Sequence, residues 1–201
     1  MTTSETMQVK TAAIADQDRA IAAVVLGFSA DPVARWSYPV PHDYLNFFPR
    51  VVSAFGGNAL HHGTGYYVGD FLGAALWLPP GIEPREEEMM ALIEQSITGH
   101  RRQEVYSLLE QMGRYHPTEP HWYLPLIGVD TMQQGKRYGS ALMAHALIQC
   151  DRDSKPAYLE SIFCGLRHSG CALGEEVVVR VSGCGAEELR VQAARQWERR
   201  V

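Results

Sequence analysis

The chain has 201 residues, 46% of them apolar, which is enough for one domain with a complete hydrophobic core, and nothing in the sequence indicates a second domain. Its net charge of −5 argues against nucleic acid as the main partner, because phosphate backbones are bound by an excess of Lys and Arg. No long apolar run and no signal-peptide pattern occurs, so we expect a soluble, cytoplasmic protein with no membrane partner.

The first half of the sequence predicts a strand and two helices, then a hairpin and two more helices. Helical segments show apolar residues at i, i+3 and i+4, whereas the strands are short apolar runs bounded by Gly and Pro. A polar lead, residues 1–8, is expected to be disordered. The expected elements are strand Val9–Ala13, a helix from Asp16 to Phe28 ended by Asp31-Pro32, a helix capped by Asp43 that reaches Phe55, strands Gly65–Val68 and Leu72–Leu78, and helices Pro84–Ile97 and Arg101–Met112.

Neither the cysteines nor the histidines are spaced as a disulfide framework or as metal ligands on one helix face. The chain is long enough to fold without disulfides, so reduced thiols are expected. We predict no metal site, and we interpret Cys150 as a packing residue. The residues weighed for these roles are Cys150, Cys164, Cys171, Cys184, His61, His62, His116 and His121.

A strand, a glycine-containing loop and a helix follow one another in the second half. Tyr123–Val129 is predicted as the strand, a polar connection follows, and Gln134–Gly139 is the loop before an apolar-faced helix. The first turn of a helix carries unpaired N–H groups and the positive end of the macrodipole, so this order suits an anion. Gly135 and Gly139 let the backbone approach such a ligand, although glycines in such turns are also common for purely structural reasons.

This segment resembles the acyl-CoA-binding motif Q/R-x-x-G-x-G/A of GNAT-type N-acetyltransferases. HWYLPLIGVD followed by QGKRYGSALM is most similar to the puromycin N-acetyltransferase-like branch, and the resemblance covers about residues 5–160. Arg137 departs from the motif, because a glycine is usual at this position. The resemblance implies that the coenzyme pyrophosphate meets Gln134, Gly135, Lys136, Arg137, Tyr138, Gly139 and Ser140, and that the pantetheine arm pairs with the strand edge at Leu126, Ile127, Gly128 and Val129.

The resemblance also implies an α+β, GNAT-like fold over residues 9–162, with a mixed, mostly antiparallel sheet flanked by helices. Two adjacent parallel strands, Tyr123–Val129 and Ala157–Ile162, would be joined by the motif helix and would splay apart around the thioester. Pro125 suits a bulge or an edge, because it cannot donate to a sheet ladder. The aromatic residues Trp36 and Tyr38 are expected in the core or, as the alternative, in a wall of the acceptor pocket.

Attack of an amine on a thioester needs a proton acceptor, because an amine with the pKa of Lys is almost wholly protonated at pH 7. Glu160, near the end of its strand, and Tyr123, at the start of the motif strand, are the candidate catalytic residues. His121 shares the Tyr123 face. A solvated strand end is the structural alternative for Glu160.

The tail, residues 163–201, departs from the family and is either diverged or frame-shifted. The family places a Tyr there that commonly acts as general acid on the thiolate, whereas this chain has no Tyr after Tyr158. We therefore expect an impaired enzyme or one with another proton donor. The spacings of Cys164, His168, Cys171 and Cys184 match no zinc finger. Val177–Val181 is predicted to pair as a strand and Ala186–Arg199 to form a terminal helix.

The sequence thus predicts an acetyl-CoA-dependent N-acetyltransferase acting on a small-molecule amine. A non-catalytic or degenerate acyl-CoA-binding module is the main alternative. A nucleotide-phosphate binder fits less well, because no G-K-[ST] follows the loop. An antibiotic, a polyamine, an amino acid and a peptide N-terminus all stay open as acceptors, and a homodimer stays open as the assembly.

Overall fold

The strands form one mixed sheet in the computed structural model, which describes residues 8–162, 176–181 and 191–193, from residue 160 onward by the backbone alone. They lie in chain order, and all neighbours are antiparallel except β4 and β5, which are parallel. The strands are β1 Val9–Thr11, β2 Gly65–Val68, β3 Gly73–Leu78, β4 Trp122–Val129, β5 Ala157–Ile162, β6 Glu176–Val181 and β7 Val191–Ala193. This is the mixed, mostly antiparallel sheet that the resemblance implied.

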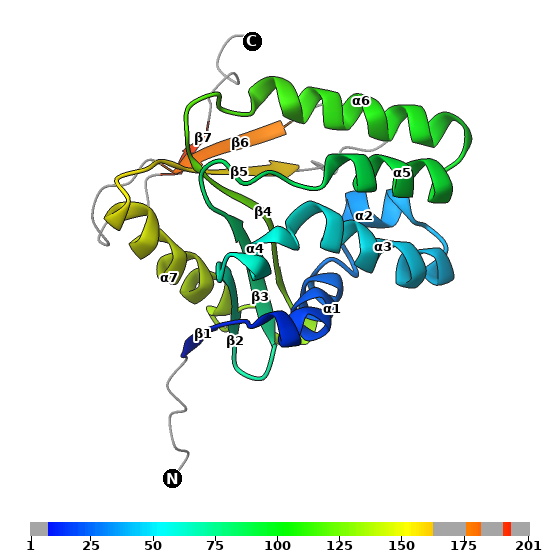
Figure 1. The fold of residues 1–201 in the computed structure, drawn as a ribbon. Helices are drawn as coiled ribbons and strands as arrows, with labels where there is room; N and C mark the ends of the chain where they lie inside the picture. Colours follow the sequence, from blue (N-terminus) through cyan, green and yellow to red (C-terminus); the bar gives the residue numbers. More distant parts are fainter. Residues whose placement is uncertain (1–7, 163–175, 182–190, 194–201) are drawn as a thin grey trace, which may run out of the picture.

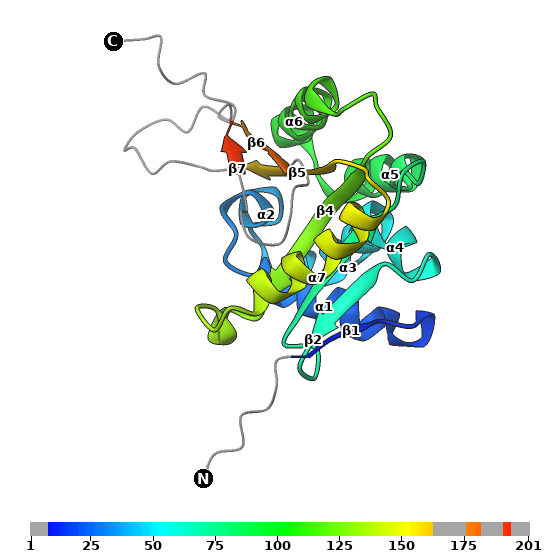
Figure 2. The ribbon, with the colours of Figure 1, turned by 90° about the vertical axis from the view of Figure 1, so that its left-hand side faces the viewer.

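Helices cover both faces of this sheet. α7 lies alone on one face, and α1, α3, α5 and α6 lie on the other (Figures 1 and 2). None of the helices in the described ranges is long and apolar enough to cross a membrane. The helices are α1 Gln17–Gly27, α2 Pro32–Ser37, α3 Pro41–Gly56, α4 Asn58–His61, α5 Glu86–Ser96, α6 Gly99–Tyr115 and α7 Tyr138–Arg152, with short 3-10 turns η1 Ile14–Asp16 and η2 Thr131–Gln133.

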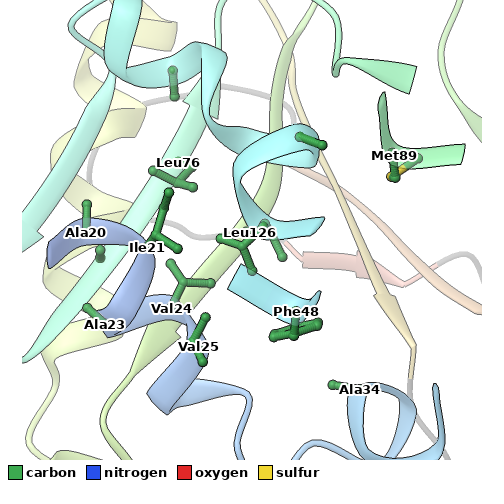
Figure 3. Packing of buried hydrophobic residues seen from close by; sticks show 14 of the residues in the cluster. Ala20, Ile21, Ala23, Val24, Val25, Ala34, Phe48, Leu76, Met89 and Leu126 are labelled. Atoms are coloured by element: carbon green, nitrogen blue, oxygen red, sulfur yellow. The ribbon is translucent and has the colours of Figure 1, made fainter. Parts of the chain in front are cut away.

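The core consists of two apolar clusters separated by the sheet. Because side chains alternate along a strand, Leu76 and Leu78 of β3 face one cluster and Trp77 faces the other. The larger cluster lies under α1, α3 and α5, where Leu76 and Leu126 meet the apolar face of α1 (Figure 3). The smaller cluster lies under α7. Each helix layer therefore has its own core, and the central strands are buried on both sides.

The segment between the first two predicted helices differs from the expectation. Asp31-Pro32, predicted to end a helix, instead begins α2: the Asp31 carboxylate accepts a hydrogen bond from the Ala34 N–H at 2.8 Å, and Pro32 takes the first helical position. α3 begins at Pro41, so Asp43 lies inside its first turn and is not the N-cap. In both places a proline with its φ already suited to a helix starts the element.

In the tail, β6 agrees with the strand predicted at Val177–Val181. The terminal helix predicted over Ala186–Arg199 is wrong at residues 191–193, because these residues pair with β6 as β7. The free edge of β6 offers backbone hydrogen bonds that compete with a short helix. The polar lead up to residue 7, and the tail cysteines together with His168, lie outside the described residues.

Candidate functional site

A β-bulge interrupts β4 near its centre. Leu76 of β3 pairs with Leu126 and Leu78 pairs with Tyr123, so β4 carries one residue more than β3 between these two pairs. The extra residue falls at Leu124–Pro125, where a proline costs no ladder hydrogen bond. The bulge explains why Tyr123 and Leu126, three residues apart, both face the larger core cluster. It lies where the sequence predicted a bulge or an edge.

The two parallel strands separate immediately after this bulge. β4 pairs with β5 only from Trp122–Leu124 to Ala157–Leu159. Beyond that point β4 continues along β3 as far as Val129, and β5 continues along β6. Among the described residues, the edge of β4 that faces away from β3 therefore has no strand partner from Pro125 to Val129. An extended ligand can pair with backbone groups at such an edge.

The connection from β4 to α7 is held by its own backbone and by the β2–β3 hairpin. Asp130 donates its N–H to the Leu72 carbonyl at 2.9 Å, and its carboxylate accepts the Met132 N–H at 3.0 Å. The Gln133 N–H then returns to the Asp130 carbonyl at 2.7 Å. These bonds fix the turn η2, so the exposed loop that follows starts from a defined position.

The loop enters α7 through two residues with left-handed backbone. Gly135 has φ +80° and Arg137 has φ +66°. Arg137 is the N-cap of α7 and makes no side-chain capping bond; the Ala141 N–H, bonded to the Arg137 carbonyl at 3.0 Å, starts the helical ladder. The N–H groups of Tyr138, Gly139 and Ser140 precede that bond and are the donors that helix geometry leaves for an anion.

The left-handed conformation of Arg137 is one that favours glycine, which accounts for the glycine usual at this position of the motif. A glycine at this position adopts a positive φ without steric cost, whereas an arginine is strained there by roughly 1–2 kcal/mol. Arg137 and Lys136 are both exposed, and Lys136 Nζ lies 2.7 Å from Gln133 Oε1. Arg137 therefore adds backbone strain to the loop, and it also adds a second positive charge beside the helix N-terminus.

Gly128 and Gly139 differ in how closely other atoms approach the position of a Cβ. A Cβ on Gly128 would lie 2.8 Å from the Val24 Cα, and a Cβ on Gly27 would lie 2.6 Å from the Gly128 Cα, so the end of α1 packs directly on the β4 backbone. A Cβ on Gly139 would meet only Val129 Cγ2, at 3.8 Å. Packing within the described residues thus requires Gly128 but not Gly139, and the space above Gly139 is open.

A cavity of about 390 Å³ opens at the splay, the place where β4 and β5 separate, on the side of the sheet opposite α7. We call it the splay cavity. The bulge and the separated strands form its floor, and α2, α3, α5 and α6 form its walls. Asp31 is its only charged lining residue among those described. The lining residues from the strands are Leu124, Pro125, Leu126, Ile127 and Leu159, and the polar lining residues are Asp31, Ser37 and Tyr38.

Solved acetyltransferase structures share the overall fold of this chain. The chain matches a histone acetyltransferase HPA2 and related acetyltransferase from Corynebacterium glutamicum with a TM-score of 0.53 and 21% identity over 78% of this chain and 77% of that one. It matches arylalkylamine N-acetyltransferase 2 from Aedes aegypti with a TM-score of 0.54 and 15% identity over 79% and 77% of the two chains. The chain has the GNAT fold.

A third solved structure, a Drosophila melanogaster polyamine N-acetyltransferase, gives a TM-score of 0.51 at 14% identity and covers 78% of this chain and 77% of that one. At the level of sequence, no protein-family model and no curated protein matches the chain. The structural similarity establishes the GNAT fold, whereas identities this low leave the substrate undecided.

Within this GNAT fold, Tyr123 lies away from the splay cavity. Its buried ring contacts Phe55 at 6.1 Å and His116 at 4.7 Å between ring centroids. It lines a second cavity, of about 380 Å³, together with His116 and His121, whose Nε2 atoms are 3.1 Å apart. Glu160 lies in β5 opposite Val178, and its side chain is outside the described residues. The structure therefore places Tyr123 beside the histidine pair, as the sequence suggested for His121, but not in the splay.

A different tyrosine, Tyr38, lies at the splay cavity, and the sequence predicted it to be in the core or in a wall of the acceptor pocket. Tyr38 lines the cavity, and its Oη lies 2.8 Å from Ser96 Oγ. Ser96 donates its only hydroxyl proton to the Leu92 carbonyl at 2.6 Å, so Tyr38 is the donor to Ser96. Burial raises the pKa of Tyr38 above its ordinary value, which keeps the phenol protonated at neutral pH.

Cys150 lies on the buried side of α7. Its Sγ donates to the Ala146 carbonyl at 3.5 Å, and it packs in the smaller core cluster. Burial, followed by the charge of Asp151, raises the pKa of the thiol to about 12. A thiol held in its neutral form and enclosed by apolar side chains is a packing group and not a nucleophile.

Proposed function

We propose that this chain is an acetyl-CoA-dependent N-acetyltransferase that acts on a primary amine of a small molecule. The observation that carries the proposal is the end of β4–β5 pairing at Leu124 and Leu159. The free β4 edge leads on one side to the loop and α7, and on the other side to the cavity. Two ligands that enter from opposite sides can therefore meet at the bulge.

The loop and the β4 edge fit the coenzyme. The N–H groups at the start of α7 and the two exposed cations, Lys136 and Arg137, suit a pyrophosphate. The backbone of Leu126–Val129 suits the two amides of a pantetheine arm. The residues proposed to hold acetyl-CoA are Leu126, Ile127, Gly128, Val129, Gln134, Gly135, Lys136, Arg137, Tyr138, Gly139 and Ser140.

In the proposed reaction the amine nitrogen attacks the thioester carbonyl carbon, a C–N bond forms, the C–S bond breaks and the coenzyme leaves as a thiolate. The amine binds as an ammonium at pH 7 and must lose a proton first, for which Glu160 stays the candidate acceptor, while Tyr123 stays a candidate for proton transfer. The thiolate then takes up a proton. Tyr38, a protonated phenol on the wall of the splay cavity, is the candidate donor that the structure adds, and it would have to release its hydrogen bond to Ser96 to act.

The acceptor class is not decided by the fold. Similar structures include an arylalkylamine and a polyamine N-acetyltransferase, whose names describe amines of very different polarity. The puromycin N-acetyltransferase-like branch stays a prediction of the motif residues. Antibiotics, polyamines, amino acids and peptide N-termini are all included in the acceptor panel described below.

A non-catalytic acyl-CoA-binding module is the second candidate. One observation favours it: the family tyrosine that commonly protonates the thiolate has no counterpart in the sequence after Tyr158. The same observation predicts that an active protein is slow or uses another donor.

Calorimetric titration with acetyl-CoA, followed by a thiol-release assay over an amine panel, separates these proposals. Binding of acetyl-CoA with turnover of any amine supports the transferase. Binding without turnover of the whole panel supports the module. Absence of binding, while desulfo-CoA also fails to bind, overturns both.

A further inference from the structure

Asp31 lies where the end of α1 meets the splay. The Gly27–Gly128 contact presses α1 onto the β4 backbone, and the Asp31 N–H bonds to the Phe28 carbonyl at 3.0 Å one turn later. One carboxylate oxygen, Oδ1, accepts the Ala34 N–H. Within the described ranges no ion pair involves Asp31. A half-buried carboxylate with no ion-pair partner among the described residues thus lines the cavity beside the strands that separate.

The rest of the cavity wall that the structure describes is apolar. Aromatic and aliphatic side chains of α3, α5 and α6 face it, and among the described lining residues only Ser37 and Tyr38 add hydroxyl groups. The hydroxyl of Tyr38 is already directed to Ser96. The cavity of about 390 Å³ lies within the range of small-molecule pockets, so it can accommodate a small aryl or alkyl body. The lining residues from these helices are Phe48, Val51, Val52, Phe55, Met89, Ile93, Ile97, Val105, Leu108, Leu109 and Met112.

The balance of charge selects among amines. One carboxylate can compensate one ammonium group. A second ammonium carried into the apolar part of the cavity would lose its hydration without a counter-charge, which is strongly unfavourable. An apolar body of the same length gains from burial instead.

We propose that the acceptor is a primary monoamine carried on an apolar aryl or alkyl body, with the ammonium held at Asp31 and the body in the cavity between α3, α5 and α6. This inference rests on the proposed function and specifies its acceptor. It excludes polyamines and amino acids as good substrates of this chain.

A matched pair of amines tests the proposal most directly. n-Hexylamine and 1,6-diaminohexane have the same length and differ by one ammonium group. With acetyl-CoA saturating, kcat/KM should be at least tenfold higher for n-hexylamine. From n-butylamine to n-hexylamine it should rise about fourfold for each methylene, as expected for burial of a CH₂. Equal or better turnover of the diamine or of spermidine overturns the proposal.

Asp31→Asn tests the role of the charge. Asparagine can still cap α2 through its side-chain oxygen, so the fold should be kept. We expect KM for n-hexylamine to rise at least tenfold, while the dissociation constant of acetyl-CoA and the melting temperature stay the same. Asp18→Asn, an exposed carboxylate in the first turn of α1, is the matched control. An unchanged KM in Asp31→Asn overturns the role of Asp31.

Val51→Phe tests the position of the apolar body. Val51 lines the cavity from α3, whereas Leu45, on the same helix, is 65% exposed. Val51→Phe should raise KM for 2-phenylethylamine at least tenfold and spare n-butylamine. Leu45→Phe, the control, should affect neither amine. The same KM for 2-phenylethylamine in Val51→Phe and the wild type overturns the placement.

Failure of the inference and failure of the proposed function give different results. Turnover restricted to spermidine or amino acids supports the proposed N-acetyltransferase function and overturns the proposed monoamine acceptor. If no amine is turned over, the transferase fails, and calorimetric titration of n-hexylamine against 1,6-diaminohexane still decides what the cavity binds. Preference for n-hexylamine that disappears in Asp31→Asn supports the inference, and equal binding of the two amines overturns it.

Discussion

The proposed coenzyme loop and the proposed acceptor cavity lie on opposite sides of the point where β4 and β5 separate, and they are built in opposite ways. The loop is continuous in sequence, exposed, and held by backbone hydrogen bonds around Asp130. The cavity is assembled from the turn after α1, from four helices and from two strands. Residues of the loop therefore act through backbone groups and a helix N-terminus, whereas residues of the cavity act through side-chain volume and one carboxylate.

The two regions also carry opposite charges. Lys136 and Arg137 flank the helix N-terminus on the loop side, and Asp31 is the one described charge that lines the cavity. These charges would direct the proposed anionic coenzyme and the proposed cationic amine to different sides of β4. If this division is correct, substitutions on one side should leave the affinity of the other side unchanged, and the following predictions test it.

The largest effect is expected from Glu160→Gln, at the strand end where the two sides meet. Loss of a general base lowers turnover by roughly 10²- to 10⁴-fold. The dissociation constant of acetyl-CoA should stay the same, because the carboxylate is proposed to act on the amine. Steady-state kinetics with calorimetry of the coenzyme measure both quantities. Unaltered turnover would remove Glu160 from the mechanism and leave Tyr123→Phe as the next variant to measure.

Substitutions of Gly139 should affect only the loop side. Gly139→Val should weaken acetyl-CoA binding more than tenfold, about 1.4 kcal/mol, because its side chain enters the space left for the pyrophosphate. Gly139→Ala should weaken binding less and raise the free energy of unfolding by up to about 1 kcal/mol, since alanine favours a helix and its Cβ meets only Val129.

Binding and stability thus change in opposite directions at Gly139, which packing alone would not produce. Cys150→Ala, on the buried side of the same helix, is the control for coenzyme affinity. Equal acetyl-CoA affinity in the wild type and Gly139→Val would show that the pyrophosphate lies elsewhere.

Cys150 gives a pH test that should be independent of both sides. Its pKa is raised by burial to about 12, from an ordinary value of 9.0. The unfolded chain therefore loses the thiol proton first as pH rises above about 9, and stability falls between about pH 9 and 12, by at most about 1.4 kcal/mol per pH unit. The free energy of unfolding, measured with denaturant at several pH values, should fall less steeply with pH in Cys150→Ala than in the wild type. The same slope in both proteins would contradict the burial of the thiol.

The smallest effect is expected at Arg137. Relief of the left-handed backbone in Arg137→Gly should raise the free energy of unfolding by about 1 kcal/mol. Arg137→Ala removes the same guanidinium but keeps the strain, so the difference between the two variants isolates the backbone. A glycine variant less stable than the alanine variant, measured by chemical denaturation, would contradict the left-handed conformation.

The sequence predicted the local backbone structure of the proposed coenzyme site. The strand, the loop and helix start around Gln134–Ser140, and a bulge or edge at Pro125, could be predicted because their geometry depends on neighbours in the chain. The parallel pairing of Tyr123–Val129 with Ala157–Ile162 followed from the same resemblance. The strained conformation of Arg137 could not be inferred, because the sequence shows only that a glycine is replaced.

The acceptor side was decided by the tertiary structure. Asp31 was interpreted as the end of a helix and Tyr38 as core or pocket wall, and both line the cavity because α1, α2 and α3 pack together against β4. Tyr123, adjacent to the bulge in sequence, instead packs beside His116. A local pattern fixes where backbone donors lie, whereas the position of a side chain in a cavity depends on how distant helices pack, and no short segment of the sequence contains that information.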